Sequence, residues 1–221
     1  MKSADGALGI LDGGLKDETL APFIARTREE LRAHNPQTLA SLCGVDYDPS
    51  SKLFSIRVLD KNLLITYPDF VAWEASGERQ EATPWLLCLL LYYFRTANGA
   101  PLTGQWVSYR ELPDGMFYHQ AFQGYSGDRL ARGFGNDLTA LETAAQAIGA
   151  RKGRLGDLSF IFDALPRVPI CLIYWLGDDD FPPTAKVVFD SSASNYLPTD
   201  VLAGVGARLC GLLLDAAGKR A

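Results

Sequence analysis

The 221-residue sequence has few cysteines, and their spacing excludes several classes of protein. None of them forms a C-x-x-C pair, which argues against zinc-ribbon, ferredoxin-like and thioredoxin-like proteins. Each lies among apolar residues, as in Leu87-Cys88-Leu89. We therefore expect buried free thiols in a reducing compartment. The four positions are Cys43, Cys88, Cys171 and Cys210.

Histidine is also scarce, and the common catalytic motifs are missing. Neither His34 nor His119 has a second histidine at the spacing of a zinc site. There is no G-x-S-x-G, Walker A or G-x-G-x-x-G sequence. Ser191 and Ser192 have no neighbouring histidine to activate them. The sequence therefore assigns no cofactor and no catalytic residue, and it leaves open whether the chain is an enzyme.

The chain lacks a basic stripe and a membrane-length apolar run. Its net charge is −5, and the densest basic segment, 151–154, holds three cations. Nucleic-acid-binding proteins carry larger Lys/Arg clusters that neutralise phosphates, so no nucleic acid is expected as a partner. The longest apolar run, 85–94, is about half of what a membrane-spanning helix needs. The N-terminus lacks the apolar region of a secretion signal, so we expect a cytoplasmic protein without membrane contact.

The periodicity predicts a flexible N-terminal arm over residues 1–16 and one α+β domain over 17–221. Strands are predicted at both ends of the domain around a helical middle, without βαβ alternation. Asn136 is expected to cap one of the helices. Helices are predicted over 17–33, 36–43, 84–97, about 117–122, 137–148 and 199–216; Gly149 is expected to end the fifth of them, and residues 104–115 are expected to be irregular. Strands are predicted over 53–59, 63–67, 158–162, 168–176 and 186–190, and the short polar break at 60–62 favours a hairpin of the first two.

The segment 85–94 is apolar on every side, which indicates a helix buried all round. Thr83 and Pro84 before it are suited to the cap and the first turn. We therefore expect an antiparallel or mixed sheet that packs against this central helix and against flanking helices.

An acidic cluster suggests one candidate site. Asp178 and Asp180 lie between two predicted strands, and Asp190 ends the second of them. Carboxylates are ligands for Mg²⁺ or Ca²⁺, so these three residues form a candidate metal site. Consecutive residues of an extended chain point to opposite faces, and Gly and Asp are also common in exposed turns. A solvated turn is thus the alternative.

Aromatic and charged residues suggest a second candidate site. Six aromatic residues crowd into positions 106–125, and such segments either line ligand pockets or pack over a core. Arg–Asp pairs can bind a carboxylate or phosphate, or can be structural salt bridges. The candidate ligand-binding residues are Trp106, Tyr109, Arg110, Tyr118, Asp157 and Arg167.

Five segments stand out as a set: 106–115, 156–160, 165–170, 175–182 and 189–193. Together they resemble a prokaryotic family, the domain of unknown function 3786, and the resemblance covers the chain from about residue 20 onward. The family occurs largely in anaerobic bacteria and archaea, and some members carry an attached iron–sulfur domain. The isolated cysteines of this sequence predict no such cluster here. The resemblance implies an accessory role in anaerobic metabolism and assigns no catalytic residue.

Three hypotheses follow for the function. The first is a small-molecule or cofactor-binding accessory module of anaerobic metabolism. The second is a metal-assisted hydrolase or transferase that uses the acidic cluster. The third is a protein–protein adaptor, with a protein partner or a second copy of the chain.

Overall fold

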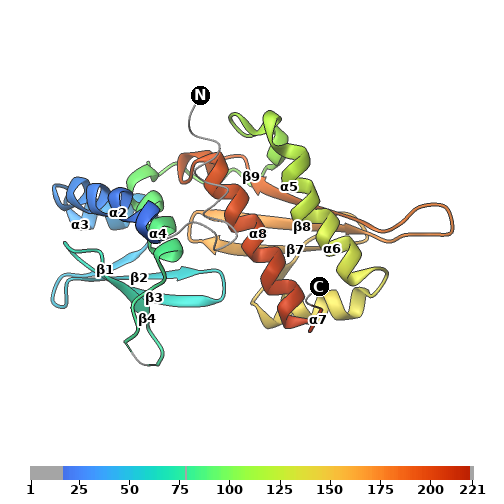
Figure 1. Ribbon diagram of the computed structural model, residues 1–221, viewed down its shortest axis with the longest axis horizontal. Helices are drawn as coiled ribbons and strands as arrows, with labels where there is room; N and C mark the ends of the chain where they lie inside the picture. The colour runs from blue at the N-terminus through green and yellow to red at the C-terminus, as the bar shows by residue number, and fades with distance from the viewer. Residues whose placement is uncertain (1–16, 78, 220–221) are drawn as a thin grey trace.

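The computed structural model describes residues 17–77 and 79–219 and contains two antiparallel sheets with helices beside each (Figure 1). The arm expected over residues 1–16 lies outside the described residues. The α+β class is confirmed, although the strands form two sheets rather than one. Within the described residues, no helix is both long enough and apolar enough to span a bilayer.

The first sheet has four strands in the order β1-β2-β3-β4 and lies beside three helices (Figure 1). The predicted hairpin is present, because β2 pairs with β3 from Leu53↔Thr66 to Val58↔Lys61. The elements of this part are α2 (Asp17–Arg32), α3 (Pro36–Cys43), β1 (Asp46–Asp48), β2 (Leu53–Val58), β3 (Lys61–Thr66), β4 (Ala72–Glu74) and α4 (Pro84–Thr96).

The second sheet has five strands in the order β5-β9-β8-β7-β6, and α5, α6 and α8 cross in front of it (Figure 1). The predicted C-terminal helix 199–216 is confirmed. The elements of this part are β5 (Trp106–Ser108), η1 (Tyr109–Glu111), η2 (Gly115–Phe117), α5 (His119–Tyr125), α6 (Gly127–Phe134), α7 (Leu138–Ala147), β6 (Arg151–Lys152), β7 (Leu158–Leu165), β8 (Val168–Trp175), β9 (Thr184–Asp190), η3 (Ala193–Asn195) and α8 (Thr199–Ala216).

One hydrophobic core includes residues from both sheets, and α4 links the two parts. The ring of Phe94 lies 4.8 Å from that of Phe54 in the first sheet, measured between centroids. Tyr93, the preceding residue, lies 6.0 Å from Tyr196, which precedes α8. The helix predicted to be buried all round is therefore central, although Trp85, Leu87 and Tyr92 are only half-buried.

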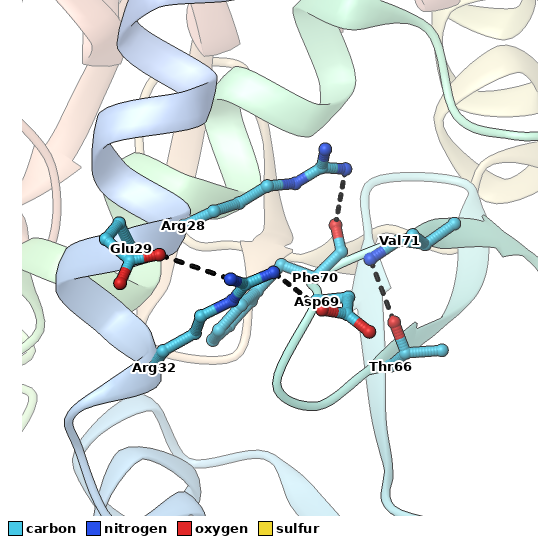
Figure 2. A network of polar contacts seen from close by, with 7 residues as sticks. All are labelled: Arg28, Glu29, Arg32, Thr66, Asp69, Phe70 and Val71. Atoms are coloured by element: carbon cyan, nitrogen blue, oxygen red, sulfur yellow. Dashed lines mark hydrogen bonds and ion pairs between the residues drawn. The ribbon is translucent and has the colours of Figure 1, made fainter.

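A polar network fixes α2 to the connection between β3 and β4 (Figure 2). The Nη2 of Arg28 donates to the carbonyl of Phe70 (3.1 Å), and Arg32 pairs with Asp69 (2.7 Å). Inside the connection, the N–H of Val71 donates to the Thr66 hydroxyl (3.0 Å). Phe70 is buried with φ at +51°, a conformation that this network and the ring's burial maintain against its steric cost.

Two local predictions need correction. The cap of α7 is Asp137, which accepts from the N–H of Ala140, and not Asn136. Asn136 instead exchanges two hydrogen bonds with the backbone of Gly177, at 2.8 and 3.0 Å. The two neighbouring residues have similar capping propensities, so sequence alone does not separate them. The segment 104–115, predicted to be irregular, contains the short strand β5, and α6 was not predicted.

Candidate ligand-binding cleft

The aromatic residues predicted to bind a ligand lie in different environments. Tyr109 is in the core, stacked on Phe122 with 4.5 Å between ring centroids. Tyr118 makes an edge contact with Tyr109 (6.5 Å). Trp106 packs on a separate small cluster formed by Cys171, Ile173 and Val188. The structure thus brings Tyr109 and Tyr118 together and places Trp106 elsewhere.

The three charged residues of the same prediction are spread along the second sheet. Arg110 follows β5, and its Nε donates to the sulfur of Met116 (3.1 Å). Asp157 accepts from the N–H of Leu176 (2.8 Å) at the end of the sheet where β7 begins. Arg167 lies in the β7–β8 turn at the opposite end, where its side chain packs against Gly44. Asp157 and Arg167 are therefore not brought together.

The three aspartates of the predicted metal site are also separated. Asp178 accepts from the N–H groups of Asp180 and Phe181, as in an Asx turn before β9. Asp190 is the last residue of β9, at the other end of that strand. Among the residues that the structure describes, no three His, Cys, Asp or Glu side chains group in a way that could hold a metal ion.

Asp190 is a buried carboxylate whose oxygens are occupied by hydrogen bonds from its own chain. Its side chain accepts from the N–H and hydroxyl of Thr103 (3.1 and 2.9 Å), the N–H of Gly104 (2.7 Å) and the N–H and hydroxyl of Ser192 (2.9 and 2.6 Å). Burial by itself raises the pKa of Asp190, but these hydrogen bonds hold it below the ordinary value. Asp190 thus fastens the segment before β5 to the end of β9.

A cleft lies where the two sheets meet. The space between its lining residues is about 380 Å³, a figure that includes the part open to solvent. Figure 1 shows the closed end of the β2–β3 hairpin pointing toward the five-stranded sheet. Residues of the hairpin, of the end of α7, of β7 and of α8 line the cleft, namely Arg57, Leu59, Asp60, Ile148, Gly149, Phe162, Asp163 and Leu209.

Two irregularities of the backbone build this junction. Val58 pairs with Lys61, so Leu59 and Asp60 form a two-residue turn, and Leu59 has φ at +52° as such turns require. The register of β7 shifts between Asp163 and Leu165, which marks a β-bulge. The N–H of Leu59 donates to the carbonyl of Ala164 in this bulge (2.9 Å). Bulges and positive-φ residues concentrate at functional sites, so both features indicate the junction as a candidate functional site.

The guanidinium of Arg57 is held at the edge of the cleft and keeps free donors. Its Nε donates to the carbonyl of Leu59 (3.1 Å). Its Nη2 passes so close to Gly149 that a Cβ there would lie 2.6 Å away, and Gly149 has φ at +83°. Among the described residues, neither Nη group of Arg57 has a hydrogen-bond or ion-pair partner. The end of α7 therefore leaves room for the Arg57 guanidinium, with which no carboxylate of the described residues pairs.

The remaining surface of the cleft is a mixture of apolar and acidic groups. Phe162 and Leu209 are 4% and 1% exposed and form an apolar floor. Asp163 is paired with Arg151 (2.8 Å). Asp60 has no such pair among the described residues. A cation, a carboxylate and an apolar surface thus border the same space, which is the composition of a site for a small polar organic molecule.

The sequence did not identify this cleft. Arg57 and Asp60 appeared in it only as the polar positions of a hairpin, and Gly149 only as a helix terminator. A positive φ at a leucine and a bulge after Asp163 have no local sequence signature, because both depend on how the two sheets dock. The exposed position of Arg57 in a strand was the single available signal.

The fold and cleft define a two-sheet α+β domain with a charged cleft at the sheet junction. Residues 35–211 match the family described as "Domain of unknown function (DUF3786)". The chain belongs to this family, as the resemblance of its motifs indicated. No curated protein and no solved structure gives a significant match.

Proposed function

We propose that this chain is a cytoplasmic small-molecule-binding module that serves anaerobic metabolism as an accessory protein. The ligand lies in the cleft at the sheet junction, with an anionic group against Arg57. The observation that carries the proposal is the guanidinium of Arg57, which borders the cleft with both Nη groups unpaired among the described residues. A guanidinium presents parallel N–H donors that match a carboxylate or a phosphate.

The site's construction also supports binding in preference to a purely structural role. The side chain of Arg57 is immobilised by the Leu59 carbonyl and by its packing on Gly149. Immobilising a long side chain before the ligand arrives lowers the entropic cost of binding. The ligand would contact both sheets at once, because the lining comes from β2 and its turn on one side and from β7 and α7 on the other.

The test combines native mass spectrometry of protein purified without oxygen with thermal unfolding against a panel of small carboxylates and phosphates. We expect a retained mass or a rise in Tm for the wild type, and its loss in Arg57→Gln. Arg154→Gln is the matched control, because Arg154 is an exposed arginine outside the cleft. The proposal fails if the wild type binds nothing in either assay, or if Arg57→Gln binds as the wild type does.

A further inference from the structure

The unpaired charges of the cleft specify the kind of ligand that it takes. We infer that the ligand is a zwitterion, a molecule that carries an anionic group for Arg57, a cationic group for Asp60 and an apolar portion for the floor. This inference rests on the proposed function and adds the ligand's chemical class to it.

The first step is the balance of charge in the cleft. Arg57, Asp60 and Asp163 line it, and Asp163 already has its counter-ion in Arg151. The charges left for a ligand are therefore one cation and one carboxylate. A simple anion would satisfy Arg57 but would meet the negative charge of Asp60, whereas a zwitterion satisfies both.

The second step is the placement of the two charges. The carbonyl that holds the Nε of Arg57 belongs to Leu59, the residue directly before Asp60. Both charged side chains thus border the cleft at one two-residue turn, yet they form no ion pair with each other in the structure. A small molecule whose opposite charges are a few atoms apart can reach both. Free α-amino acids have that arrangement.

The apolar lining of the cleft consists of the floor residues Phe162 and Leu209 and of Leu59, and all three side chains are buried. Burial of an aliphatic or aromatic side chain against them would add hydrophobic stabilisation that glycine cannot supply. Within the class of zwitterions, the cleft therefore favours amino acids with apolar side chains over glycine.

The experiment is isothermal titration of the full chain with glycine, valine, leucine and phenylalanine, and with two derivatives of leucine. Leucinamide lacks the anionic group, and N-acetylleucine lacks the cationic group. We expect leucine or phenylalanine to bind best, and each derivative to bind at least about tenfold more weakly, as for loss of a charged hydrogen-bonded pair. Arg57→Gln and Asp60→Asn are expected to weaken leucine binding similarly, while the exposed-site controls Arg154→Gln and Asp179→Asn leave it unchanged.

A cross-comparison assigns each group to its partner. Arg57→Gln removes the charge that distinguishes leucine from leucinamide, so these two should bind alike to that variant. Asp60→Asn removes the charge that distinguishes leucine from N-acetylleucine, so those two should bind alike to it. The zwitterion inference is overturned if no amino acid binds the wild type, or if N-acetylleucine binds as tightly as leucine. If N-acetylleucine or a simple carboxylate still binds in an Arg57-dependent way, the proposed binding function survives without the zwitterion. If no probe and no panel compound binds, both fail.

Discussion

The hydroxyl of Tyr93 on α4 donates a 2.6 Å hydrogen bond to the carbonyl of Cys43 at the end of α3. The same hydroxyl accepts from the N–H of Arg167 in the β7–β8 turn (3.1 Å). One buried side chain thus joins the helices beside the first sheet to the second sheet. Desolvation raises the pKa of Tyr93, so the hydroxyl stays protonated and able to donate.

We predict that Tyr93→Phe lowers the free energy of unfolding by about 2 kcal/mol, because it leaves a buried carbonyl and a half-buried N–H without partners. Tyr92→Phe is the control, since Tyr92 is half-buried and keeps its stacking on Phe23 (4.2 Å) when the hydroxyl is removed. Chemical denaturation of the three proteins measures the difference. Equal stabilities of the two variants would show that the Tyr93 hydroxyl contributes nothing to the docking of the two parts.

Asp190 should govern part of the acid stability. Its native pKa lies below the ordinary value, so it stabilises the fold above about pH 4 and loses this contribution as the pH falls through the native pKa. Asp190→Asn removes the charge and points the NH2 group of the new amide at N–H and O–H donors. We therefore predict that it lowers the free energy of unfolding by about 3 kcal/mol at pH 7.

Between about pH 5 and pH 2, the unfolding free energy of Asp190→Asn should also vary less with pH than that of the wild type. The difference should be about what the titration of one carboxyl group contributes. Asp163→Asn is the control, because Asp163 is exposed and has a single surface ion pair. Urea titrations at several pH values supply the comparison. A wild-type acid profile in Asp190→Asn would contradict the assignment.

The sequence predicted those helices and strands that short-range periodicity and capping residues determine. The apolar helix around Leu89, the hairpin between Leu53 and Thr66 and the last helix from Thr199 follow from periodicity and caps, and all three are present. The short strand β5 was missed because its existence depends on pairing with β9, for example Trp106 with Asp190, which is far away in the sequence. Pairing at that separation leaves no local periodicity in a three-residue strand.

Functional sites were harder to predict from the sequence than helices and strands. The segments 175–182 and 189–193 carried the family resemblance and the acidic cluster. In the structure, however, Asp178 accepts hydrogen bonds in a turn and Asp190 anchors a loop. Their distinctive composition reflects backbone groups that need acceptors. Arg57, in contrast, sits in an ordinary alternating strand, and only the docking of the two sheets places it beside a cleft.

The cysteines should be unreactive in the native state. All four are free and buried. Burial raises the pKa of Cys43 and Cys210 to about 12, and that of Cys88 and Cys171 to about 11. At pH 8 the thiolate fraction is thus about one in a thousand or less, and the sulfurs are shielded as well. We predict no reaction with Ellman's reagent over minutes in buffer and four reacting thiols in guanidinium chloride. A thiol that reacts fully in buffer would show that its surroundings open.

Gly149 and Arg57 should be energetically coupled. Gly149→Ala places a methyl group 2.6 Å from the present position of Arg57 Nη2 and also strains a residue with φ at +83°. We predict a loss of about 1.5–2 kcal/mol of unfolding free energy, of which about 1 kcal/mol is the strain alone. In an Arg57→Ala background, only the strain should remain, so the double-mutant cycle should give a coupling of about 0.5–1 kcal/mol.

The matched control for that cycle is Gly218→Ala, because Gly218 follows the end of α8 as Gly149 follows the end of α7. It has φ at +66°, and among the described residues no atom beyond its chain neighbours lies within 4 Å of an added Cβ. Its cost should not exceed the strain alone and should be the same in the wild-type and Arg57→Ala backgrounds. If Gly149→Ala costs the same with and without the Arg57 side chain, the guanidinium does not pack on the end of α7. The preorganisation that we propose for ligand binding would then be absent.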